Sequence, residues 1–205
     1  MTDTAAKNLS QSAGVPATCS TIRPKLFVPP FRELRGYAFD PSLSRQIDTA
    51  FLNEIKYKVR WEDLLAPGPV GEYLEVMDYD PSSGQWYAPV DLNAPYLLAQ
   101  DGLPPSESNP QFHQQMVYAV AMTTIANFEN ALGRQVFWSP RRLKHTGEHT
   151  SQDLERGAVA PSKYEEYVQR LRIYPHAFRG ANAYYSPEKK ALLFGYFSAR
   201  PANNT

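Results

Sequence analysis

The chain has 205 residues and a formal net charge of zero at pH 7, and 42% of its residues are hydrophobic. This balance supports one packed domain and excludes a chain that is disordered throughout. Its single cysteine, Cys19, excludes both an internal disulfide framework and a zinc site built on several cysteines.

Hydropathy gives an expectation about location. No run of apolar residues approaches the ~18 that a membrane-spanning helix needs, and the first twenty residues lack the apolar core of a signal peptide. We therefore expect a cytoplasmic protein with no membrane partner.

Charge is distributed unevenly along the chain. Between Trp61 and Gly133 there are ten acidic residues and no Lys or Arg, whereas residues 134–205 hold 12 Lys and Arg and 6 acids. Charge runs of this kind usually form solvated loops or faces that attract each other within one domain. The basic residues are interleaved with acids and no nucleic-acid reading motif accompanies them, so we expect no nucleic-acid partner.

The first half of the chain predicts a β-rich unit. Residues 1–24 are polar and aperiodic and predict a flexible N-terminal arm, which leaves 25–205 as a single domain. Asp40 followed by Pro41 is typical of a helix start, and apolar residues alternate with Lys and Arg over 55–61. The expected elements are a strand over 34–39, a short helix over 40–52, a strand over 55–61, and a hairpin formed by 72–79 and 85–90.

The turn of that hairpin has a second interpretation. Asp78, Asp80 and Ser82 stand at alternate positions, as in a calcium-binding loop. Such a loop requires glycine at its sixth position and glutamate at its twelfth, and this sequence has Ser83 and Pro89 there. We therefore predict an ordinary β-turn that begins at a proline.

A long helix is the strongest predicted element. After a loop over 91–109, Asn109 is the expected N-cap, and Gly133 is the expected end. The apolar stripe is so broad that it indicates burial on more than one side. We expect a structural or surface role for His113, in the first turn. The stripe consists of Phe112, Met116, Val117, Val120, Ala121, Ile125, Phe128 and Leu132.

The C-terminal third predicts more β-structure. Ser162 and Glu165 have the spacing of a capping box, which predicts a short helix to about Arg170. A strand over 171–178 and a hairpin of 181–186 with 191–197 follow. The predicted fold class is α+β, with a β-rich N-terminal part, one long buried central helix and a C-terminal β-hairpin with an edge strand.

One segment matches a metal-binding pattern. His145-Thr-Gly-Glu-His149 has the spacing H-x-x-E-H of inverted zincins. Gly147 disfavours the helix that would align the two histidines, and no third protein ligand stands out. We interpret the segment as an exposed loop, with His145 and His149 as weak metal candidates only. The sequence also lacks the H-E-x-x-H, P-loop, G-x-G-x-x-G and G-x-S-x-G motifs.

The segment Asn182-Ala183-Tyr184-Tyr185, with the helix over 110–132 before it and the strand up to Phe197 after it, resembles the front half of thermolysin-like (gluzincin) bacterial metallopeptidases. In that family a strand reading Asn-Ala-aromatic-aromatic lies at a sheet edge and pairs with the substrate backbone. The resemblance implies that these four residues bind substrate. It extends over residues 34–197, and the motif itself is only four residues long.

The same resemblance implies what this chain lacks. The family's zinc-binding H-E-x-x-H helix should follow the closing strand, but Thr205 is only 23 positions past Asn182 and the motif is missing. We therefore expect the substrate-strand half of a zinc-metallopeptidase-like protein, not catalytic as this isolated chain. Zinc is expected only where a downstream H-E-x-x-H segment exists, so no cofactor is expected in this chain.

Two other functions remain open at this point. The chain could be a non-catalytic protein-interaction or structural module of a larger assembly, or, less well supported, a metal enzyme that uses His145 and His149. Partners that fit an edge strand are a peptide or protein segment that adds as another strand, a missing C-terminal half, or a second, self-associating copy of the chain.

Overall fold

The computed structural model describes residues 28–45, 48, 50–142 and 165–198. The predicted arm over 1–24 and the candidate metal residues His145 and His149 lie outside these described residues. The strands of the described part are β1 (Phe31–Tyr37), β2 (Glu54–Arg60), β3 (Leu74–Val76), β4 (Tyr79–Asp80), β5 (Gln85–Trp86), β6 (Arg141–Arg142), β7 (Glu165–Glu166), β8 (Leu171–Arg179), β9 (Ala183–Ser186) and β10 (Ala191–Tyr196). The helices are α1 (Pro95–Ala99) and α2 (Pro110–Leu132), with short 3-10 helices at Pro41–Arg45 and Ala50–Leu52.

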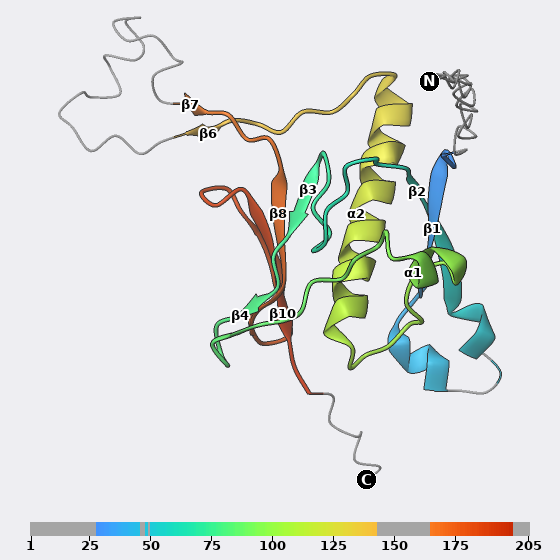
Figure 1. The fold of residues 1–205 in the computed structure, drawn as a ribbon. Helices are drawn as coiled ribbons and strands as arrows, with labels where there is room; N and C mark the ends of the chain where they lie inside the picture. Colours follow the sequence, from blue (N-terminus) through green and yellow to red (C-terminus); the bar gives the residue numbers. More distant parts are fainter. Residues whose placement is uncertain (1–27, 46–47, 49, 143–164, 199–205) are drawn as a thin grey trace, which may run out of the picture.

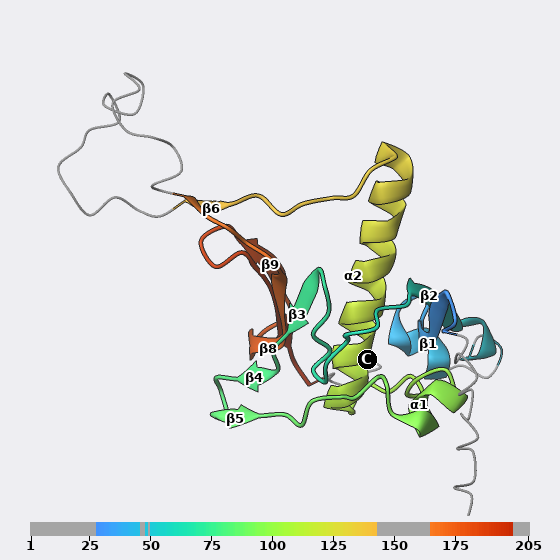
Figure 2. The same ribbon diagram turned by 45° about the horizontal axis from the view of Figure 1, so that its top comes forward.

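Helix α2 occupies the centre of the fold, between two β layers (Figure 1). On one side, β1 and β2 form an antiparallel pair. On the other, β3, β8, β10 and β9 form a sheet in that order, in which β8 is parallel to both β3 and β10, and β9 is antiparallel to β10. Helix α2 contacts both layers, and Figure 2 shows them on its two sides from a second direction. The predicted α+β class, with a long central helix and a C-terminal hairpin, is confirmed.

Local signals set both ends of α2. The Asn109 side chain accepts a hydrogen bond from the N–H of Gln111, and Pro110 is the first helical residue. Gly133 has φ of 67°, the left-handed conformation that glycine adopts without a Cβ clash, and its N–H donates to the carbonyl of Glu129. The predicted bounds of this helix are therefore correct.

The buried face of α2 is not the predicted stripe. Phe112 and Ile125 are buried, but Val120, Phe128 and Leu132 lie exposed, and Phe128 is 60% exposed. Several residues of α2 that are buried in their place are polar. The polar residues buried on this helix are Gln114, Gln115 and Glu129.

The two buried glutamines tie α2 to the chain that precedes it. The Gln114 Oε1 atom accepts from the N–H of Val90, and its Nε2 donates to Asp78 Oδ2, both at 2.8 Å. The Gln115 Oε1 atom accepts from the N–H of Leu103 at 2.8 Å. Buried polar groups require such partners, so these contacts fix the irregular chain between β5 and α2. Hydrophobic periodicity could not reveal them.

The short helix predicted over 40–52 is wrong as a continuous element. Asp40 does cap, because its Oδ1 accepts from the N–H of Ser42, but the described residues there form two short 3-10 helices. Asn53, which is buried, donates from Nδ2 to the Asp40 carbonyl and accepts at Oδ1 from the N–H of Phe39. These hydrogen bonds join Asn53 to the residues that precede the first 3-10 helix.

Other predicted elements also need correction. Residues 165–170 are not helical, because β7 pairs with β6 and the chain after it is irregular. The hairpin predicted over 72–90 is shorter, since only β4 and β5 pair with each other, and β3 joins the main sheet beside β8. The predicted loop over 91–109 contains α1.

The core lies where α2 meets both β layers and the chain around α1. The buried apolar residues that pack together are Leu34, Val59, Leu65, Leu74, Val76, Val90, Leu92, Leu97, Tyr118, Ala119, Met122, Ile125, Leu171 and Ile173.

Neither α-helix of the described residues is long and apolar enough to cross a membrane.

Candidate functional site

Strand β9 is the last strand of the main sheet. It pairs with β10, with Tyr184 opposite Leu193 and Tyr185 opposite Leu192, and within the described residues no strand pairs with its other side. All four residues that the sequence singled out, from Asn182 to Tyr185, are exposed. The structure therefore places Ala183, Tyr184 and Tyr185 on a strand at the edge of the sheet, with Asn182 directly before it.

Backbone geometry shows which groups point outward from this edge. Hydrogen-bonded and non-hydrogen-bonded pairs alternate in antiparallel strands, and the N–H of Gly195 donates to the carbonyl of Asn182 at 2.8 Å. It follows that Ala183 and Tyr185 direct their N–H and C=O groups away from β10. Asn182 covers one of them, because its Oδ1 accepts from the N–H of Ala183 at 2.9 Å.

The two tyrosines lie on opposite faces of the sheet. Directly opposite residues of an antiparallel pair share a face, so Tyr185 lies with Leu192, which packs against the core. Tyr184 lies on the other face, where its ring packs against Phe178 with a centroid distance of 5.7 Å. Both rings remain nearly half exposed, and each can therefore contact a neighbouring strand.

A hollow of about 760 Å³ adjoins the beginning of β9. Arg179, Gly180 and Ala181, which lead into Asn182, form one wall, and Tyr196 and Phe197 at the end of β10 contribute to it. Phe197 is 66% exposed. An extended segment that follows β9 would thus reach a surface with one cationic and two aromatic side chains.

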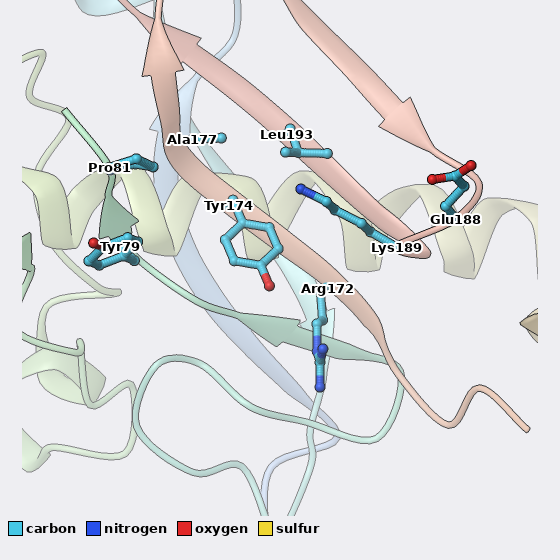
Figure 3. A pocket seen from close by; sticks show the side chains of 8 residues that line it. All are labelled: Tyr79, Pro81, Arg172, Tyr174, Ala177, Glu188, Lys189 and Leu193. Carbon is cyan, nitrogen blue, oxygen red and sulfur yellow. The ribbon is translucent and has the colours of Figure 1, made fainter. Parts of the chain in front are cut away.

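A separate pocket of about 460 Å³ lies on the face of the sheet turned away from α2 (Figure 3). Tyr174 lies in its centre, with Tyr79 on one side and Arg172 and Lys189 at its rim. Arg172 Nε donates to Glu75 Oε2 at 3.0 Å, so its positive charge is already paired. The pocket is therefore aromatic, with little unbalanced charge, and Tyr184 is not among its lining residues.

A buried polar network lies on the α2 side of the sheet, and sequence reasoning missed it. His176 of β8 places Nδ1 2.6 Å from Asp78 Oδ1 and Nε2 2.9 Å from His113 Nδ1. The ring of Tyr87 packs against His176 with a centroid distance of 4.9 Å. The spacing of residues in the sequence could not indicate this contact, because His113 and His176 are 63 positions apart.

Burial lowers the pKa of His113, and the neighbouring His176 acts in the same direction. His176 and Asp78 are almost fully buried. Of the structural or surface role predicted for His113, the structural one fits this position, whereas the sequence had suggested Asp78 only as a calcium ligand.

Asp80 forms a second buried polar centre next to the network. Its Oδ2 accepts from the hydroxyls of Tyr196 and Ser83, both at 2.7 Å, and its Oδ1 accepts from the N–H of Ser82 at 2.8 Å. Burial acts to raise the pKa of Asp80, but these hydrogen bonds outweigh burial and lower that pKa to about 2. The carboxylate thus organises the predicted turn after β4 and ties it to β10.

The described residues do not provide a metal centre. No group of three or more His, Cys, Asp and Glu side chains among them could hold a metal ion. The 2.9 Å between His113 and His176 nitrogens suits a shared proton and is too short for a zinc ion between them. His145 and His149 lie outside the described residues, and their role as metal candidates stays open.

Comparisons of the chain with protein-family models, curated proteins and solved structures found no match. The function of the β9 edge is therefore inferred from its geometry and its sequence.

Proposed function

We propose that this chain binds an extended peptide or protein segment by strand addition along β9, as the substrate-strand part of a zinc-metallopeptidase-like protein. The observation that carries the proposal is that β9 pairs on one side only within the described residues. The outward carbonyl of Ala183 and the outward N–H and carbonyl of Tyr185 are the groups that an added strand uses, since the N–H of Ala183 already donates to Asn182.

The composition of β9 supports this proposal. Sheet edges are commonly protected by Lys, Pro or a bulge, and Ala183–Ser186 contains none of these. Tyr184 and Tyr185 offer exposed rings on both faces, so that an added strand gains side-chain contacts on either side. Because Asn182 Oδ1 already binds the N–H of Ala183, its Nδ2 is the group that can donate to a peptide carbonyl.

The resemblance to gluzincins suggests that such binding would serve peptide hydrolysis by a zinc enzyme. The zinc histidines and catalytic glutamate of that family are not in this sequence, and the described residues do not fit a zinc ion. We therefore expect this chain by itself to bind peptides without cleaving them. A non-catalytic interaction module would use the same edge. The two functions differ in one outcome: in the metallopeptidase-like protein, a partner that supplies H-E-x-x-H would cleave the bound peptide, whereas an interaction module would only bind it.

The binding experiment starts with random heptapeptides selected on the immobilised chain. The selected peptides, labelled with fluorescein, are then titrated with the chain and followed by fluorescence anisotropy. Tyr185→Pro removes the outward N–H without removing a bond to β10, since proline is tolerated where an edge N–H faces away from the sheet. We expect micromolar binding that weakens at least tenfold in Tyr185→Pro.

The matched control is Tyr185→Phe, which keeps the backbone and the ring and should bind as tightly as the original chain. Circular dichroism checks that Tyr185→Pro stays folded. If no peptide is selected, or if Tyr185→Pro binds as tightly as Tyr185→Phe, strand addition at β9 is not the function of this edge.

A further inference from the structure

His113, His176 and Asp78 connect three separate parts of the fold. His113 belongs to the first turn of α2, His176 to β8, and Asp78 to the segment between β3 and β4. The two imidazoles and the carboxylate are in one line of hydrogen bonds, at 2.9 Å and 2.6 Å. Gln114, the next residue of α2, donates to the second oxygen of Asp78. The line is therefore the polar junction between the helix and the main sheet.

The bonding partners restrict how many protons the line can hold. An ionised Asp78 only accepts hydrogen bonds, so His176 Nδ1 must carry a proton and donate it. The contact between His176 Nε2 and His113 Nδ1 holds only one proton, because one nitrogen must donate and the other accept. Two protonated rings would place two N–H groups against each other at 2.9 Å. The intact line thus permits at most one of the two histidines to be positively charged.

Other titratable groups also surround this line. Within the described residues the Tyr87 ring packs on His176, and the Tyr196 ring meets it edge-on at 5.4 Å. Backbone groups of the loop before α2 act on His113. The titratable and charged groups around the line are Asp80, Tyr87, Glu107, Arg179 and Tyr196.

We propose that His113, His176 and Asp78 form an acid-opened latch between helix α2 and strand β8. When both histidines take up a proton, the His113–His176 bond cannot persist, and the first turn of α2 separates from β8. The latch concerns the α2 side of the sheet, so this inference stands or falls independently of peptide binding at β9.

The pH range of opening follows from His113. Burial and the neighbouring His176 lower the pKa of His113 in the closed fold. In the opened chain His113 has the ordinary histidine pKa near 6.5, so it binds a proton at a higher pH than in the closed fold. The closed state is then fully stable above about pH 6.5 and loses stability as the pH falls toward the lowered pKa. For one proton, the equilibrium constant for opening rises about tenfold per pH unit in that window.

The test follows the histidine ring signals and amide exchange by NMR on the full chain between pH 7.5 and 4.5. We expect the His113 ring to titrate below 6.5. The protection factors of first-turn amides of α2 should fall about tenfold per pH unit over the same range, while those near Gly133 stay constant. A His113 ring that titrates at or above 6.5, or first-turn protection that is independent of pH, would overturn the latch.

Substitution gives an independent measurement. His113→Asn keeps an amide near the Nδ1 position but does not titrate, and Gln111→Asn introduces the same side chain in the same helical turn but outside the line. We expect the melting temperature of His113→Asn to lose its dependence on pH below 6.5, and that of Gln111→Asn to keep it. Equal pH dependence in both variants contradicts the proposal. If His113→Asn does not fold, the NMR titration of the unsubstituted chain still decides.

Discussion

At the scale of single residues, the two carboxylates that suggested a calcium loop have unrelated structural tasks. Asp78 accepts from His176 and Gln114, and Asp80 accepts from Tyr196 and from the turn that follows it. Alternating acids indicate calcium only with the rest of the loop pattern. Here each acid is used to join distant parts of the chain, so neither is left to coordinate an ion.

Asp80 predicts how the protein responds to acid. Its pKa of about 2 lies below the usual 3.8, so its contribution to stability is complete above about pH 4 and is lost as the pH falls toward 2. Tyr196→Phe removes one of the hydrogen bonds that lower this pKa. We expect acid unfolding of Tyr196→Phe, followed by circular dichroism, to begin at a higher pH than in the original chain.

Tyr174→Phe is the matched control for that experiment, because Tyr174 is also a half-buried tyrosine of the main sheet, but its hydroxyl contacts the Met77 sulfur, at 3.7 Å, and Arg172 instead of a carboxylate. It should unfold at the same pH as the original chain. Identical acid unfolding of both variants would show that Tyr196 does not stabilise the ionised Asp80.

At the scale of elements, α2 organises the fold through one buried face. Ile125 lies in the core and is 7% exposed, whereas Phe128 on the same helix is 60% exposed. Ile125→Asp buries an unpaired charge, and we expect it to lower the free energy of unfolding by about 3–5 kcal/mol. Urea unfolding measures this loss.

Phe128→Asp places the same charge one turn later on the exposed face of α2. We expect its free energy of unfolding to lie within about 0.5 kcal/mol of the original value. A loss in Ile125→Asp as small as that in Phe128→Asp would mean that α2 is not buried as described.

What could be predicted from the sequence depended on how local the signal was. Asn109 and Gly133 set the ends of α2 by contacts within a few residues, and the alternation of apolar and basic residues predicted β2. The helix expected over 40–52 failed because Asn53 makes tertiary hydrogen bonds. At the candidate site, the exposed edge at Asn182 could be predicted, since hairpin and motif are contiguous in sequence. His176 could not, because its partners are far away along the chain.

At the scale of the whole molecule, oppositely charged segments that lie far apart in the sequence pair with each other. Arg172 of the basic C-terminal third pairs with Glu75 of the acidic middle segment at 3.0 Å. Arg179 donates to the hydroxyl of Tyr196, which donates in turn to Asp80. These contacts connect β8 and β10 to β3 and β4. The acidic middle segment and the basic C-terminal third therefore stabilise the main sheet by pairing with each other.

The prediction about zinc has to be tested on the full chain, because His145 and His149 lie outside the described residues. We expect calorimetry with zinc chloride to show no sub-micromolar site that depends on them. The control is a double variant, His145→Ala with His149→Ala, which should bind zinc as the original chain does. Sub-micromolar binding that the double variant loses would assign a metal site to the H-x-x-E-H segment.

The central claim is that β9 offers a free edge to an extended peptide, and amide hydrogen exchange at two neighbouring residues tests it most directly. Tyr184 directs its N–H toward β10 and Tyr185 directs its N–H outward. We predict that the Tyr184 amide is protected with and without a selected heptapeptide, and that the Tyr185 amide exchanges rapidly in the free chain and becomes protected at saturating peptide. A Tyr185 amide that is already protected in the free chain, or that exchanges equally fast with bound peptide, would contradict the claim.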